Sequence, residues 1–172
     1  DHTRQTGGVR NFEHSHFFED VYTYNDFVHS GSNQALKPRK EVVRTRVPYL
    51  VTEHNGHMFP TKKLDCEEKR VEHALRHLRV LNDMYGSEEI SGAIGWCMAD
   101  YNTHAEFGSG DRVCYHGVLD AFRLQKDAAA AYASQAEGTP YLRVSSLMNP
   151  GDLDEAKIGR VYVFTNCDAV RV

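Results

Sequence analysis

The stretch Pro48-Tyr-Leu-Val-Thr-Glu-His-Asn-Gly-His57 decides the predicted fold of this chain. An apolar, β-prone run over residues 49–51 ends at a carboxylate, Glu53, and polar or flexible residues follow it. A short run of this kind favours a strand over a helix. A buried strand that ends in a charged side chain is typical of a (β/α) barrel, where active sites lie at the carboxyl ends of the strands. Glu53 is therefore a candidate functional residue, and a strand-end Glu paired with a neighbouring Arg is the structural alternative.

A helix and a second strand complete a βαβ unit. Residues 91–96 are again apolar and β-prone, and they end at Trp96, the only tryptophan of the chain. Between the two strands, the segment Glu67–Tyr85 has apolar residues at helical spacing, and Gly86 follows it at the position of a C-cap glycine. A strand, a helix and a strand in this order predict two parallel strands. Glu53 and Trp96 should then lie at the same edge of the sheet.

Several segments together resemble one family of enzymes. These segments are Glu19–Phe27, Pro48–His57, Arg70–His77, Ser91–Trp96 and Asp120–Lys126. Over about residues 1 to 135 they are similar to the second half of the catalytic barrel of glycoside hydrolase family 2, the bacterial β-galactosidase and β-glucuronidase family. The resemblance implies an α/β fold, a partial (β/α)8 TIM barrel of about strands 5–8. The four strands are expected near residues 7–10, 20–25, 49–53 and 91–96.

The expected domain organisation follows from the same resemblance. Residues 1–135 form the half barrel, 136–140 a linker, and 141–172 the start of an immunoglobulin-like β-sandwich. Residues 141–147 and 160–164 alternate as strands do. A complete barrel needs about 250 residues, so we expect this chain of 172 residues to hold part of one barrel and a truncated sandwich. The open sheet edges of a half barrel could join copies of the chain into a homo-oligomer.

The resemblance also implies the chemistry of a retaining β-glycosidase, which uses two carboxyl groups about 5–5.5 Å apart. Glu53 matches the catalytic nucleophile of the family. Trp96 matches the aromatic residue that walls the sugar site, since an indole presents an apolar face to the C–H face of a sugar ring. Tyr24 and Asn25 match the strand end beside the nucleophile, and we expect a hydrogen bond from Tyr24 to hold Glu53 ionised.

Further polar residues are expected to bind the sugar hydroxyl groups, because His and Asn side chains both donate and accept hydrogen bonds. His57 is similar to a sugar-contacting His of the family after a shift of one residue, and Asn55 competes with it for this role. His54 is another candidate at the mouth of the barrel. His104 and His116 fall in predicted loops as well, and for these two we expect a surface position without function.

The second carboxyl group of the family is a Glu that follows an Asn, and the chain contains no Asn-Glu pair. The segment Asp1–Arg10 resembles the part of the family that comes after this pair. We therefore expect the acid/base before Asp1, and no turnover by the isolated chain, since general acid catalysis contributes about 10²–10⁴-fold. A β-galactoside substrate is favoured, because no cluster of Lys and Asn at a strand end would bind a carboxylate. The alternatives are a β-glucuronidase as the parent activity, and a carbohydrate-binding or structural fragment without catalysis.

Composition limits the other classes of function. The net charge of −4 is spread without a basic stripe, so nucleic acid is not an expected partner. No run reaches the roughly 18 apolar residues of a membrane span, and no compartment is indicated. Four cysteines without CxxC spacing predict free thiols. His73 and His77 lie four apart on the predicted helix, but without a third ligand in view we predict structural or solvated roles rather than a metal site. No cofactor is expected.

Three further predictions concern positions outside the strand ends. Residues 30–46 are rich in small and charged residues and predict a mobile surface connection. The alanine-rich stretch at 128–133 predicts a packing helix. Asp100, which follows Trp96 by four residues, either orients the loop of that tryptophan or caps a turn.

Overall fold

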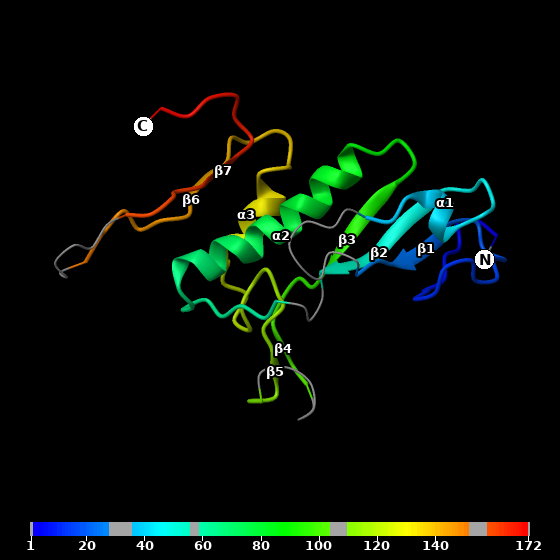
Figure 1. The fold of residues 1–172 in the computed structure, drawn as a ribbon, viewed down its shortest axis with the longest axis horizontal. Helices are drawn as coiled ribbons and strands as arrows, with labels where there is room; N and C mark the ends of the chain where they lie inside the picture. The colour runs from blue at the N-terminus through cyan, green and yellow to red at the C-terminus, as the bar shows by residue number, and fades with distance from the viewer. Residues whose placement is uncertain (1, 28–35, 56–58, 104–109, 152–157, 172) are drawn as a thin grey trace.

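Three parallel strands form the sheet that positions the candidate site (Figure 1). The computed structural model describes residues 2–27, 36–55, 59–103, 110–151 and 158–171. The strands are β1 (Tyr22–Asn25), β2 (Tyr49–Asn55) and β3 (Gly92–Trp96), and they pair in that order. Both pairings are parallel. The strands predicted near residues 20–25, 49–53 and 91–96 are therefore confirmed.

The strand predicted near residues 7–10 forms only in part. Gly7 makes an isolated parallel bridge with Val21. The carbonyl of Arg10 accepts a hydrogen bond of 2.8 Å from the N–H of Asn25. The segment thus runs along the outer side of β1 without the regular ladder of a strand. Its two consecutive glycines are a sufficient reason, since glycine weakens the interior of a strand.

Helix α2 (Glu67–Tyr85) has the predicted bounds, and Gly86 is its C-cap residue. Because α2 connects the parallel strands β2 and β3, the predicted βαβ unit is confirmed. Figure 1 shows the C-terminal half of α2 beside the sheet and its N-terminal half beside α3 (Asp127–Ala133). None of the helices in the described part of the chain is long and apolar enough to cross a membrane.

Two apolar clusters hold these elements together. The first lies between the sheet and the end of α2, and it contains Tyr22, Tyr24, Leu36, Val42, Val43, Tyr49, Val51 and Val80. The second joins α2, α3 and the C-terminal segment, and it contains Ala74, Ala128, Ala130 and Phe164. The alanine-rich stretch is therefore a packing helix, as predicted. Its small side chains suit a close approach of two helices.

The prediction of a surface connection over residues 30–46 was wrong for its second half. Residues 28–35 lie outside the described residues, but Leu36, Val42 and Val43 are buried in the first cluster. A short helix, α1 (Arg39–Val42), lies within this segment. The segment is polar on average, but it contains three buried apolar side chains. The free energy gained by burying these side chains places this part of the segment in the core.

Two antiparallel hairpins follow the sheet. Strands β4 (Tyr101–Asn102) and β5 (Val113–Cys114) pair in the connection after β3. Strands β6 (Leu142–Val144) and β7 (Val163–Thr165) pair near the C-terminus, and both fall in or beside the segments predicted to alternate as strands do. The described residues thus form an α/β unit with a three-stranded sheet and a terminal hairpin, and the half barrel and the immunoglobulin-like sandwich remain predictions.

A buried ion pair fastens the connection after β3 to the start of α3. The Nζ of Lys126 lies 2.6 Å from the Oδ1 of Asp100, and both residues are nearly inaccessible to solvent. Lys126 also donates to the carbonyl of Thr61 at 2.7 Å, and the N–H of Gly117 donates to Asp100 at 2.9 Å. These bonds reach residues 17 and 26 positions further along the chain, so of the two roles predicted for Asp100 they support holding the loop that follows Trp96 rather than capping a turn. Burial raises the pKa of Asp100 and lowers the pKa of Lys126, against the hydrogen bond between them.

A β-bulge near the end of β2 decides which side chains share a face of the sheet. Tyr24 pairs with Val51, but Asn25 pairs with Glu53, so Thr52 is an extra residue in the ladder. In a regular strand Glu53 would lie on the helix-covered face with Val51. The bulge returns Glu53 to the open face, next to Thr52, because an extra residue re-aims the side chains that follow it.

Candidate active site

Glu53 lies at the C-terminal end of β2 and is held by the neighbouring strand. The Nδ2 of Asn25 donates a hydrogen bond of 2.8 Å to the Oε2 of Glu53. The Oγ1 of Thr52 donates a bond of 3.0 Å to the Oδ1 of Asn25. The backbone is joined at the same point, since the N–H of Asp26 donates to the carbonyl of Glu53 at 2.9 Å. Glu53 is partly buried, and an amide donor of this kind favours the ionised form of a carboxyl group.

Trp96 lies at the corresponding end of β3. In the ladder between β2 and β3 it is the partner of Asn55, two residues after Glu53, so both predicted strand ends meet at one edge of the sheet. Its side chain is 40% exposed. The Nε1 donates a bond of 3.2 Å to the hydroxyl of Tyr101, and the two rings lie perpendicular with centroids 6.0 Å apart. Tyr101 thus fixes the edge of the indole, and the peptide bond from Trp96 to Cys97 is cis.

Tyr24 does not make the predicted hydrogen bond to Glu53. It lies in the apolar cluster on the helix-covered face, and its hydroxyl donates to Glu13 at 3.0 Å and accepts from Lys37 at 3.1 Å. Lys37 and Glu13 also form a direct ion pair, and the hydrogen bond from Lys37 lowers the pKa of Glu13 to about 2. Since adjacent residues of a strand point to opposite faces, only Asn25 of the predicted pair can reach the nucleophile candidate.

Asn55 ends β2 in a left-handed conformation with φ of 68° and is buried. Its Oδ1 is bonded to the Nδ1 of His54. His54 itself is fully buried on the helix-covered face, where its ring meets that of His77 at 5.7 Å between centroids. The prediction of His54 as a sugar contact was therefore wrong. His57, the competitor of Asn55, and His104 lie outside the described residues.

The buried histidines form a structural cluster behind the sheet. The rings of His73 and His77 lie 5.2 Å apart on α2, and the Nδ1 of His77 is 2.8 Å from the hydroxyl of Tyr132 on α3. Both histidines are buried, so of the two predicted roles the structural one is correct. The expected surface position of His116 was wrong, because only 2% of this residue is exposed. Across the described ranges, no group of three His, Cys, Asp or Glu side chains is arranged to hold a metal ion.

The burial of His73 predicts a loss of stability in weak acid. Burial, with smaller effects from Lys126 and His116, lowers the pKa of His73 to about 3 from an ordinary value of 6.5. The unfolded chain therefore binds a proton below about pH 6.5 that the folded chain excludes until about pH 3. Above about pH 6.5, His73 is neutral in both states and does not lower the free energy of unfolding. Between about pH 6.5 and pH 5, the free energy of unfolding falls by about 2 kcal/mol because of this residue.

Urea unfolding of the protein at a series of pH values measures this effect. The variant His73→Gln should show a flatter fall of the free energy of unfolding between about pH 6.5 and pH 5. The control is His16→Gln, since His16 is exposed, and it should keep the slope of the original protein. Equal slopes in all three proteins would contradict the prediction.

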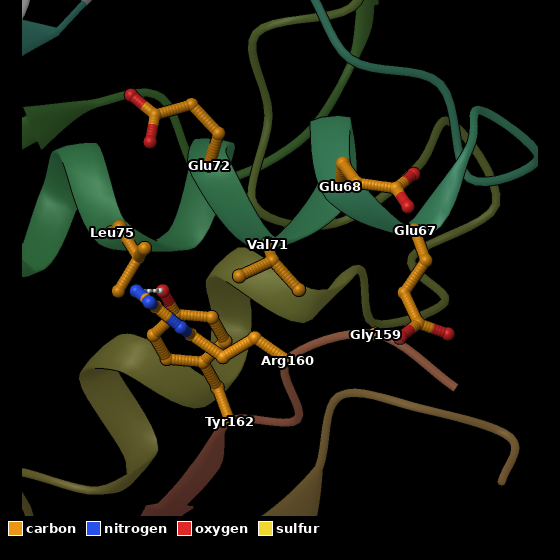
Figure 2. A pocket seen from close by; sticks show the side chains of 8 residues that line it. All are labelled: Glu67, Glu68, Val71, Glu72, Leu75, Gly159, Arg160 and Tyr162. Carbon is orange, nitrogen blue, oxygen red and sulfur yellow. Dashed lines mark hydrogen bonds between the residues drawn. The ribbon is translucent and has the colours of Figure 1, made fainter. Parts of the chain in front are cut away.

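A separate cavity of about 280 Å³ lies along the N-terminal half of α2 (Figure 2). Figure 2 shows the side chain of Arg160 beside the ring of Tyr162, and its Nη1 is 3.5 Å from the hydroxyl. The lining consists of Glu67, Glu68, Val71, Glu72, Leu75, Gly159, Arg160 and Tyr162. No residue of the parallel sheet is among them. The cavity therefore lies between α2 and the C-terminal segment and is not part of the candidate site.

The prediction from sequence missed two residues that support the site. Thr52 bonds to Asn25, and Tyr101 bonds to Trp96. Thr52 directly precedes Glu53, but an alternating strand would place the two side chains on opposite faces, so the pattern gave no reason to connect them. Tyr101 belongs to the short hairpin after β3, and no periodicity marks it.

Known proteins are similar to this chain in sequence and in fold. No protein-family model matches the chain. Over its whole length the chain is 52% identical to a β-galactosidase of Thermoanaerobacterium thermosulfurigenes and 42% identical to one of Thermoanaerobacter pseudethanolicus. It spans 25% and 23% of these relatives, about a quarter of their length.

A solved structure shows the same fold. The crystal structure of a GH2 β-galacturonidase from Eisenbergiella tayi, bound to galacturonate, matches 74% of this chain and 26% of its own chain, with a TM-score of 0.59 and 16% identity. At this identity the likeness concerns the fold alone. Together with the relatives that match the chain from end to end, it confirms the resemblance seen in the strand-end motifs. The chain is thus similar in sequence to β-galactosidases over its whole length, and its fold is similar to that of a GH2 enzyme.

Proposed function

We propose that this chain supplies the nucleophile of a retaining β-glycosidase that acts on terminal β-galactosides. The observation that carries the proposal is the hydrogen bond from Asn25 to Glu53 at the C-terminal edge of the sheet, next to the strand that ends at Trp96. A partly buried carboxylate at this edge with an amide donor on one oxygen suits attack on a sugar. The name β-galactosidase of the two relatives supports the choice of sugar.

The proposed reaction has two steps. In the first, a carboxylate oxygen of Glu53 forms a bond to the anomeric carbon, and the bond from that carbon to the leaving oxygen breaks. A general acid protonates the leaving oxygen. In the second step the same group takes a proton from water, the water oxygen bonds to the anomeric carbon, and Glu53 leaves as a carboxylate. Two displacements on one carbon retain its configuration.

The general acid is proposed to come from outside this sequence. The family places it in an Asn-Glu pair, and the chain has none. In this proposal Asn25 holds one oxygen of Glu53, Trp96 lies against the apolar face of the sugar, and Asn55 or His57 binds its hydroxyl groups. Tyr24 is left out, because its hydroxyl is engaged by Glu13 and Lys37 on the other face.

The proposed domain division keeps residues 1–135 as the barrel part, 136–140 as the linker and 141–172 as the start of a sandwich. Hydrogen bonds from Asn166 hold the proposed linker in place. The Nδ2 of Asn166 donates to the carbonyls of Ala136 and Thr139, and its Oδ1 accepts from the N–H of Tyr141. These bonds fix where the chain leaves α3 and enters β6.

An assay of two polypeptides tests the proposal. The whole protein that carries this sequence should hydrolyse a nitrophenyl β-galactoside faster than the matching β-glucuronide, with retention seen by NMR of the first product. The 172-residue chain alone should show no turnover, because general acid catalysis by itself contributes about 10²–10⁴-fold. Hydrolysis by the isolated chain would contradict the placement of the acid, and an inverted first product would contradict the two-step reaction.

A non-catalytic role is the second candidate for the isolated chain, and the missing acid is the observation that favours it. Such a chain would still present the exposed ring of Trp96 to a sugar. Binding of galactose by the isolated chain, seen as a change in the fluorescence of its single tryptophan, would support this role. An unchanged spectrum in a chain that is folded by circular dichroism would count against it.

A further inference from the structure

Two consecutive side chains of β2 reach the same residue of β1. The Oγ1 of Thr52 is 3.0 Å from the Oδ1 of Asn25, and the Nδ2 of Asn25 is 2.8 Å from the Oε2 of Glu53. Only the β-bulge permits this, since neighbouring side chains of a regular strand point to opposite faces. The bulge thus closes a chain of bonds from Thr52 through Asn25 to Glu53.

The chemistry of the three groups gives this chain a direction. An ionised carboxylate only accepts hydrogen bonds, so it requires the NH2 end of the Asn25 amide. The carbonyl end of the amide then faces Thr52, whose hydroxyl must donate. Asn25 is 7% exposed, so water has little access to replace a lost partner of that carbonyl.

We propose that Thr52 is a positioning residue for the nucleophile. Its hydroxyl satisfies the buried carbonyl of Asn25 and so holds the amide in the plane and orientation that point the NH2 group at Glu53. Without that hydroxyl, the carbonyl of Asn25 lacks a hydrogen-bond donor, so a rotation of the amide toward another donor is favoured. The rotation takes the NH2 group of Asn25 away from the carboxylate of Glu53. This inference rests on the proposed function of Glu53, and it adds a residue that touches neither the sugar nor the nucleophile.

The variant Thr52→Val, made in the whole protein, tests the proposal, because valine keeps the shape and removes the hydroxyl. We expect kcat to fall about tenfold, equivalent to about 1.4 kcal/mol, while KM changes by less than about threefold. The fall of kcat/KM on the acid side should move to higher pH, because the ionised nucleophile loses a donor. Thr52→Ser keeps the hydroxyl and should restore kcat to within about threefold.

Thr23→Val is the matched control. Thr23 is two residues before Asn25 on the same face of β1, is also buried, and its Oγ1 has no hydrogen-bond partner among the residues that the structure describes. This variant should keep both kcat and the pH profile. It separates the loss of one hydroxyl at Thr52 from a general effect of placing valine in this sheet.

A double variant gives the sharpest test. Since Thr52 acts through Asn25, Thr52→Val should lower kcat no further in an Asn25→Ala background. The proposal would be overturned if the loss of kcat in the double variant equalled the product of the losses in the two single variants. It would also be overturned if Thr52→Val left the acid side of the pH profile of kcat/KM unchanged. If Glu53→Gln remains active, the function proposed for Glu53 is wrong. If Glu53→Gln is inactive while Thr52→Val equals the original protein, only the role of Thr52 is wrong.

Discussion

Replacing Glu53 by Gln in the whole protein should lower kcat by several orders of magnitude while sugar binding survives. Gln keeps the shape of the side chain and can still meet the amide of Asn25, but it lacks the anionic oxygen that attacks the anomeric carbon. A thousandfold loss would correspond to about 4 kcal/mol of transition-state stabilisation. Steady-state kinetics with a nitrophenyl β-galactoside measure the loss, and KM separates it from a binding defect.

Covalent labelling identifies the nucleophile directly. A 2-deoxy-2-fluoro galactoside with a good leaving group should add its sugar mass to Glu53, because the fluorine slows the breakdown of the intermediate. Glu68→Gln is the matched control, since Glu68 is an exposed residue of α2, and it should label and turn over normally. Sugar mass on another carboxylate, such as Glu67 or Asp100, would leave Glu53 as a structural strand-end residue.

Replacing Lys126 by Met should destabilise the fold by about 3–5 kcal/mol. The change leaves the carboxylate of Asp100 buried without its cation, and the carbonyl of Thr61 also loses a donor. Burial already raises the pKa of Asp100, and removing the cation raises it further. The uncharged form is then favoured in the folded state, so the deficit should shrink as the pH falls. Urea unfolding at about pH 7 and about pH 5 measures both effects.

Two variants serve as controls for this prediction. Lys62→Met removes an exposed ion pair with Asp111, whose atoms are 3.4 Å apart, and should cost less than about 1 kcal/mol. The double variant Lys126→Met with Asp100→Leu removes both buried charges and should recover part of the loss. If Lys126→Met and Lys62→Met lowered the free energy of unfolding equally, the buried pair would contribute no more to stability than the exposed one.

The local patterns of the sequence were sufficient for the βαβ unit. The bounds of α2 follow from helical spacing and a closing glycine, and both strand ends follow from apolar runs that stop at polar residues. Parallel pairing then brings the ends of β2 and β3 to one edge without further information. These features depend on residues close together in the chain, which is why the sequence predicts them.

Burial of polar aromatic residues was less predictable. His54 and His116 are loop-like in sequence, yet both are buried, whereas the polar segment at 30–46 hides three apolar core residues. A histidine suits a solvated loop or a packed interior equally well when its ring has partners, and partners on other elements do not show in a local pattern. For His54, the ring of His77 on α2 is such a partner.

By itself, the sequence determined that a carboxylate and a tryptophan end adjacent parallel strands, because strand and helix periodicities are local. Only the tertiary structure decided which neighbour holds Glu53. A single extra residue in β2 turns its carboxylate toward Asn25 and away from Tyr24. The bulge changes the register between two strands, and this register depends on how the sheet packs on α2. The residues of a single strand therefore do not predict it.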